Sequence, residues 1–148
     1  MLKFLKPSDF QMKIKDNVFA DILDADLTGV GPENEKLQLA ERQAIEMMDS
    51  YIGNVYDMEF MLSRKDGERN IVIIDILTTL VVYLLFQRTT IDIIPEQRLT
   101  DYENKIQTIK DLRDGKINIK SPKKNINYDN RLQNLYSNNI NTINDWDY

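Results

Sequence analysis

The chain has 148 residues, of which 42% are hydrophobic, and a formal net charge of −5. This length fits one domain, and the negative charge disfavours electrostatic binding along a nucleic-acid backbone. The sequence contains no cysteine and no histidine, which excludes disulfides, thiol and imidazole catalysis, and ordinary zinc sites. It also contains no Walker loop, dinucleotide fingerprint or Gly-x-Ser-x-Gly elbow. We therefore expect no enzyme activity, no cofactor and no bound metal.

The first predicted element is an amphipathic helix over residues 8 to 24. Pro7 suits the first turn of a helix, and Ser8 or Asp9 can cap its free N–H groups. Apolar residues then recur every four positions, which places them on one face of the helix. They are Phe10, Ile14, Val18 and Ile22. The glycines and the proline of residues 28–32 end the helix.

A second helix is predicted from just after Pro32 to about Asp57. Its inner stripe has apolar residues three or four positions apart. These are Leu37, Ala40, Ala44, Met47, Tyr51 and Val55. The outer face is predicted to carry Glu41, Arg42, Glu46 and Asp49. Residues 58–69 are charged and include an Asp66-Gly67 turn signal, so we expect an exposed loop or a short hairpin there.

The most apolar segment spans residues 71–86 and predicts a helix over residues 70–88 that is buried on all sides. Asp75 interrupts this segment, which is shorter than the roughly 20 apolar residues that cross a bilayer. We therefore expect no membrane span. A chain of this size has few other residues with which to cover such a helix completely. The surplus apolar surface predicts a contact with another copy of the chain, with Val82 and Leu85 at the subunit interface.

Asp75 is the one unusual acidic residue, because it lies within an apolar helix. A buried carboxylate needs a partner of opposite charge. The candidate partners are Arg42, Arg64, Arg69 and Arg88. An ion pair, or exposure at a subunit boundary, explains this residue better than a catalytic role does.

A third long helix is predicted from Pro95 to Arg113, and Gly115 supplies its C-terminal stop. Its apolar face consists of Leu99, Tyr102, Ile106, Ile109 and Leu112. The alternating residues 116–120 then indicate either a strand or an arm that lies on another surface.

Residues 121–148 are rich in asparagine and lack a sustained apolar face. They nevertheless include Tyr136, Trp146 and Tyr148, although disordered tails usually contain few aromatic residues. Tryptophan and tyrosine often dominate the binding energy at protein interfaces. We therefore predict a helical domain of residues 1–120 and an extended C-terminal arm that binds a partner through these three residues. The alternative is a disordered tail without a partner.

Residues 24 to 35 nearly match the calcium-binding loop of an EF-hand. The matching positions are Asp24, Asp26, Thr28, Gly29 and Glu35. However, Gly31 stands where such loops need an apolar residue, Pro32 follows it, and the sequence has no second copy of the motif. A helix end, a glycine-rich turn and the start of the next helix explain the segment without a metal. A small calcium-responsive or helix-binding interaction module is the alternative function.

The order of these elements also carries a family resemblance. It lies in Ala44-Ile-Glu-Met-Met-Asp-Ser-Tyr51, Tyr83-Leu-Leu-Phe-Gln-Arg88, Pro95-Glu-Gln-Arg-Leu-Thr-Asp-Tyr102 and Leu112-Arg-Asp-Gly-Lys-Ile117. Over residues 8–119 the chain resembles the head-to-tail connector, or adaptor, proteins of tailed bacteriophages, in particular the Mu-like small virion protein family. The most specific part is the Arg-x-x-Asp-Tyr helix that closes in Gly-Lys-Ile.

This resemblance implies an all-α fold, a small helical bundle of about four helices with a short hairpin or loop and an extended C-terminal arm. It implies a structural virion protein of the neck, assembled in the host cytoplasm. Proteins of this kind form a ring, usually dodecameric, beneath the portal and extend the DNA channel. The implied partners are copies of the chain, the portal protein, and other neck or tail proteins, with no membrane. DNA would pass through the channel without specific binding, because an acidic lining repels it.

Overall fold

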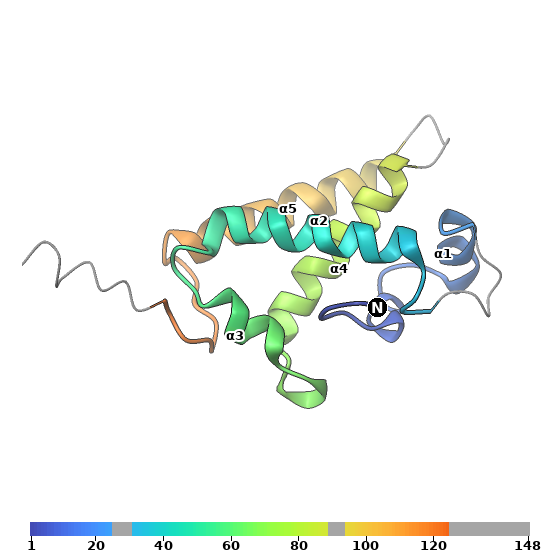
Figure 1. Ribbon diagram of the computed structural model, residues 1–148. Helices are drawn as coiled ribbons and strands as arrows, with labels where there is room; N and C mark the ends of the chain where they lie inside the picture. Colours follow the sequence, from blue (N-terminus) through green and yellow to red (C-terminus); the bar gives the residue numbers. More distant parts are fainter. Residues whose placement is uncertain (25–30, 89–93, 125–148) are drawn as a thin grey trace, which may run out of the picture.

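The computed structural model describes residues 1–24, 31–88 and 94–124. Within these ranges every regular element is helical, so the predicted all-α fold is confirmed. In chain order the elements are η1 (Pro7–Phe10), α1 (Asp16–Ile22), α2 (Glu35–Ile52), α3 (Met58–Ser63), η2 (Asp66–Glu68), α4 (Ile71–Arg88) and α5 (Glu96–Arg113) (Figure 1).

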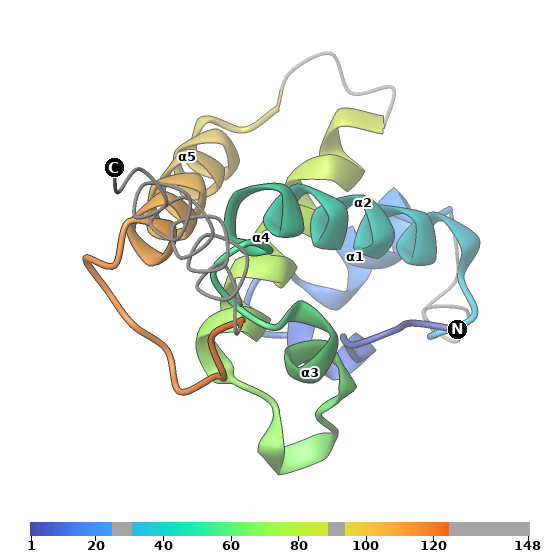
Figure 2. The same ribbon diagram turned by 60° about the vertical axis from the view of Figure 1, so that its left-hand side comes forward.

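The body of the protein consists of α2, α4 and α5, which have 18 residues each. Each of these three helices contacts the other two, and α4 runs obliquely across α2 (Figure 1, Figure 2). Large apolar side chains without exposed surface fill the space between them. They include Leu37, Met48, Ile73, Ile76, Leu77, Leu80, Ile109 and Leu112. Removal of this apolar surface from water is the main force that holds the three helices together.

The helix predicted over residues 70–88 is confirmed as α4 and is buried along most of its length. The buried hydroxyls of Thr78 and Thr79 donate hydrogen bonds to the carbonyl oxygens of Ile74 and Asp75 at 2.7 and 2.9 Å. Both polar groups are therefore satisfied inside the core. By length and composition α4 could cross a membrane, but 61% of it is buried inside the structure. The core helix of a soluble protein shows the same combination.

The N-terminal region is not the single helix that the sequence predicted over residues 8 to 24. It contains η1, a turn and then α1, because Lys15 adopts an extended backbone with a ψ of 142°. The apolar spacing still identified core residues. Phe10 and Phe19 are buried, and their rings stack with centroids 4.9 Å apart.

The second helix also ends earlier than predicted, at Ile52 instead of near Asp57. Asp57 instead caps α3, because its side chain accepts the N–H of Phe60 at 2.9 Å. The predicted loop or hairpin of residues 58–69 therefore contains α3 and η2. The turn signal at Asp66 corresponds to a left-handed residue with a φ of 48°.

The third long helix ends where the sequence predicted. Gly115 has a φ of 73°, which glycine adopts without strain. The Gly115 N–H donates to the Leu112 oxygen at 3.3 Å, and the Lys116 N–H donates to the Asp111 oxygen at 2.9 Å. These bonds satisfy carbonyl groups of the last turn of α5.

Residues 122–124 then lie against the loop between α2 and α3. The Asp57 N–H donates to the Pro122 oxygen at 3.0 Å, and the Lys124 N–H donates to the Val55 oxygen at 2.9 Å. Tyr56 and Lys123 form an antiparallel β-bridge, the single isolated one among the described residues. Residues 121–124, which the sequence assigned to the C-terminal arm, are therefore attached to the helical body.

Candidate interaction surfaces

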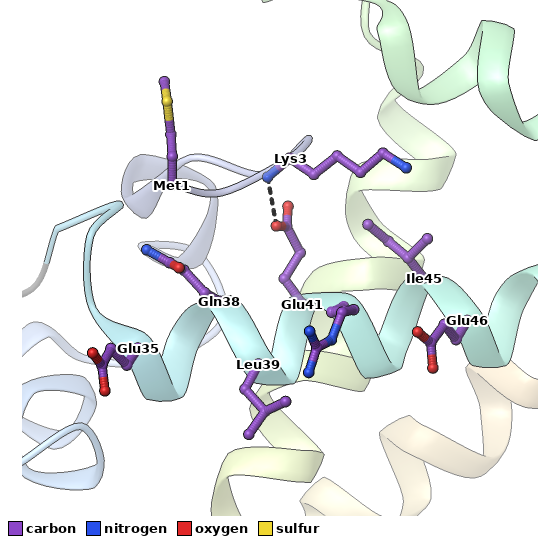
Figure 3. A pocket seen from close by; sticks show the side chains of 9 residues that line it. Met1, Lys3, Glu35, Gln38, Leu39, Glu41, Ile45 and Glu46 are labelled. Carbon is purple, nitrogen blue, oxygen red and sulfur yellow. Dashed lines mark hydrogen bonds between the residues drawn. The ribbon is translucent and has the colours of Figure 1, made fainter.

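A buried glutamate of α2 holds the N-terminal segment, residues 1–6, in place. Glu41 is only 2% exposed, so its predicted position on the outer face is wrong. Its Oε2 accepts the Lys3 N–H at 2.6 Å, and its Oε1 accepts the N–H groups of Phe4 and Leu5 at 2.8 and 2.7 Å. Figure 3 shows the carboxylate extending from α2 toward this segment. Three N–H donors thus replace water around the buried charge.

A second polar anchor joins η1 to the turn before α4. Arg69 donates two hydrogen bonds to the Asp9 carboxylate, at 2.6 and 3.0 Å, and a third to the Phe4 oxygen at 3.1 Å. The two charged side chains are only 9% and 10% exposed. The Asp9 carboxylate also accepts the Lys6 N–H at 2.7 Å. A bidentate pair of this kind fixes both distance and orientation, so it restrains the N-terminal segment in a second place.

Two open hollows lie along α2 and meet at Lys3. One, of about 630 Å³, lies between the N-terminal segment and the first half of α2, and the other, of about 770 Å³, lies between α2 and α3. Ile45 and Glu46 line both hollows. Their other lining residues include Glu35, Leu39, Arg42, Asp49, Met58, Glu59 and Leu62. This mixed apolar and charged lining resembles a polypeptide contact surface more than a small-molecule site.

Asp75 forms ion pairs with Lys13 and Lys105, so the four arginines predicted as its partners are the wrong residues. Burial is the largest single influence on this carboxyl group and raises its pKa. The two lysines together nevertheless hold the pKa of Asp75 below its usual value. Arg98 of α5 also donates to the Lys13 oxygen at 2.7 Å. The cluster therefore joins α4, α5 and the turn after η1.

Apolar side chains that the core leaves uncovered lie at the start of α4. Ile71 is 80% exposed and Val72 is 40% exposed. Phe60 of α3 is 38% exposed and lies 4.1 Å beneath the Arg64 guanidinium. In Figure 1 the turn between α3 and α4 projects from the bundle. The two helices that flank this turn therefore each offer exposed apolar side chains to another protein.

The surplus apolar surface of α4 is not at the predicted positions. Val82 and Leu85 are each 2% exposed, because they belong to the core that α4 shares with α2 and α5. The prediction that these two side chains face outward is therefore wrong. The predicted partner-binding residues Tyr136, Trp146 and Tyr148 lie outside the described residues.

The predicted calcium-type loop is described only at its ends, because residues 25–30 lie outside the described residues. Asp24 forms an ion pair with Lys36 of α2, and Glu35 is the first residue of that helix. Across residues 1–24, 31–88 and 94–124, no three potential metal-ligating side chains gather at one point.

Two of these polar sites were missed by the sequence analysis for different reasons. The burial of Glu41 could have been inferred from the sequence, since it lies one helical turn from both Leu37 and Ile45, which are buried. The pairing of Lys13 and Lys105 with Asp75 could not have been inferred, because they are 62 and 30 positions from Asp75 in the sequence. Only the packing of α4 against its neighbours brings these charges together.

These observations define a small all-α protein with a packed helical body, two polar anchors for its N-terminal segment, and exposed apolar and charged surfaces. The family model of bacteriophage Mu Gp36 matches residues 5–134. The chain therefore belongs to the bacteriophage Mu Gp36 family, which confirms the predicted Mu-like phage relationship and supports a phage structural protein. No curated protein and no solved structure matches the chain.

Proposed function

We propose that this chain is a structural protein of the phage neck, where it forms a ring at the portal, joins the head to the tail and extends the DNA channel. The observation that carries the proposal is the family match over residues 5–134, which includes every described helix from η1 to α5. The phage assignment thus concerns the whole helical body. The connector role follows from the resemblance of residues 8–119 to adaptor proteins.

The exposed turn between α3 and α4 supports a role in assembly. Ile71 is 80% exposed, whereas Ile73 and Ile76 on the same helix are fully buried. Covering this exposed apolar side chain with another protein would lower the free energy of the system. A neighbouring copy of the chain is the partner that the ring would place there.

The remaining partners of the proposal are the portal protein and other neck or tail proteins. Residues 125–148 supply aromatic side chains for this docking, namely Tyr136, Trp146 and Tyr148. The net charge of −5 suits a channel through which DNA passes without being held. The place of action would be the neck of the virion, after assembly in the host cytoplasm.

A helix-binding module is the second candidate, favoured by the two hollows along α2 that share Ile45 and Glu46. The two functions differ in the size of the assembly that they predict. A ring subunit forms a large closed particle, whereas a helix-binding module forms a complex of one or two chains.

Single-particle imaging of the purified protein, alone and mixed with the portal and neck proteins of the same phage, tests the proposal. We expect ring-shaped particles, dodecameric at the portal, that occupy the neck position. A protein that binds no portal or neck component, and forms no ring with them, would contradict the connector role. Binding to an isolated helical peptide without ring formation would favour the second candidate.

A further inference from the structure

Two parts of the sequence carry strongly opposite charge. Residues 16–35 contain six acidic and no basic residues, whereas residues 110–124 contain six basic and two acidic residues. The second range is a local reversal of sign in a chain whose net charge is −5. Exposed patches of opposite sign select their partners by electrostatic complementarity.

The acidic end of the molecule consists of α1 and the start of α2. Asp16, Asp21 and Glu35 are exposed and form no ion pair with any described residue. Asp24, just after α1, forms an ion pair with Lys36 in the first turn of α2. In Figure 1, α1 lies near the N-terminal end of α2, so the unpaired acidic side chains belong to one end of the molecule.

The basic end is the segment that follows α5. Lys120 and Lys123 are exposed, and neither forms an ion pair within the part of the chain that the structure describes. The Lys124 side chain donates to the Gly53 oxygen at 3.4 Å, which places this segment just beyond the C-terminal end of α2. Ile117, which is 40% exposed, adds an apolar side chain to the same segment.

The two ends are too far apart to neutralise each other within one molecule. In Figure 1 and Figure 2, α1 and residues 114–124 lie toward opposite ends of α2. Since α2 has 18 residues, its length is about 27 Å. The Debye length at 0.1 M salt is only about 10 Å. Each end therefore remains available to a partner of opposite charge.

We propose that the basic end of one copy docks on the acidic end of the next copy, with Lys120 and Lys123 facing Asp16, Asp21 and Glu35. This proposal rests on the ring of the proposed function and names two charged surfaces that would contribute to it, in addition to the apolar side chains at Ile71. An interface between two different patches is heterologous, and it generates a ring when the rotation closes. DNA is a poorer partner for the basic end, because the chain as a whole is acidic.

Two double variants test this contact. Lys120→Glu with Lys123→Glu makes the contact acidic on both sides, and Asp16→Lys with Asp21→Lys makes it basic on both sides. Each variant alone should stay folded and associate at least about tenfold more weakly than the wild type in sedimentation at low salt. Mixed in equal amounts, the two should recover association, because each contact again joins opposite charges.

Glu96→Lys with Glu103→Lys is the matched control for the aspartate variant, since it makes the same charge change as Asp16→Lys with Asp21→Lys at two exposed positions of α5. This control should associate as the wild type does. Unchanged association in both test variants would overturn the interface and leave the ring, and so the proposed function, in place. Recovery that stops at a dimer would overturn the head-to-tail arrangement.

Two further results would also overturn the proposal. A wild-type protein that stays monomeric at low salt would exclude this contact, although assembly on a portal would still support the proposed function. If the Lys120→Glu, Lys123→Glu variant keeps full association but loses binding to a double-stranded DNA probe, the basic end serves DNA instead. Sedimentation and fluorescence anisotropy on the same preparations separate these outcomes.

Discussion

Glu41 carries a buried charge whose only described partners are three backbone N–H groups. Glu41→Gln keeps the shape of the side chain but weakens the acceptor and adds an N–H group where donors already converge. We expect a loss of about 2 kcal/mol in the free energy of unfolding, measured by urea denaturation. Glu46→Gln, at an exposed position of the same helix, should change it by less than about 0.5 kcal/mol. Equal effects in the two variants would contradict the anchoring role.

Asp75 should make stability depend on pH. Its pKa is lower in the folded protein than its usual value of 3.8, so its ion pairs stabilise the fold above that pH. This contribution is lost as the pH falls through the folded-state pKa, because the protonated acid no longer attracts Lys13 and Lys105. The stability difference between the wild type and Asp75→Asn should therefore be larger at pH 7 than at pH 3. Chemical denaturation at several pH values measures it, and a constant difference would contradict the prediction.

At this scale the sequence identified unusual residues more reliably than their partners. Asp75 stood out because a carboxylate within an apolar helix is costly unless it is paired. Its actual partners are Lys13 and Lys105, and the sequence alone could not distinguish these lysines from the arginines that were predicted. Glu41 was misplaced because its partners are backbone N–H groups, which nearly all residue types possess and which therefore leave no mark in the sequence.

At the scale of elements, the free energy of unfolding should be sensitive to truncation of a side chain near the C-terminal end of α4 and insensitive to truncation at its first residue. Leu85→Ala should reduce the free energy of unfolding by about 2 to 5 kcal/mol, since Leu85 is 2% exposed in the core. Ile71→Ala should change it by less than about 0.5 kcal/mol, since Ile71 is 80% exposed. Thermal unfolding followed by circular dichroism measures both effects.

The same helix separates folding from assembly. Ile71→Lys should leave the monomer folded but reduce ring formation, because a charge placed in an apolar contact is costly to bury. Leu85→Lys should instead disrupt the helical body itself. Size-exclusion chromatography, combined with circular dichroism, distinguishes the two results. Full assembly of the Ile71→Lys variant would place the subunit contact away from the turn between α3 and α4.

Long helices were predicted well, and short ones were not. α4 is apolar on all sides over 18 residues, and α5 has apolar residues three or four positions apart over 18 residues, so their type and ends could be read from the sequence. α3 has only six residues, and its capping Asp57 was taken as the end of the preceding helix. The break at Lys15 was also invisible, because the apolar spacing continued through it while the backbone did not.

At the scale of the whole molecule, the proposed docking arm can be separated from the helical body after Lys124. Removal of residues 125–148 should keep the thermal stability of the body, because the contacts of Pro122 and Lys124 with the loop before α3 remain. Removal from residue 121 should cost an additional 1 kcal/mol or so per lost backbone hydrogen bond. Circular dichroism of the two shortened proteins measures this difference.

Both shortened proteins should fail to dock on the portal or neck partner, because both lack the aromatic residues of the arm. In the full chain, Trp146→Ala should weaken docking by about 2 kcal/mol or more, as expected for a buried aromatic anchor. Asn144→Ala is the matched control on the same arm and should have little effect. Surface plasmon resonance with the immobilised partner measures all four proteins. If the protein without residues 125–148 binds with unchanged affinity, the helical body carries the contact, and the exposed turn at Ile71 becomes the first surface to test.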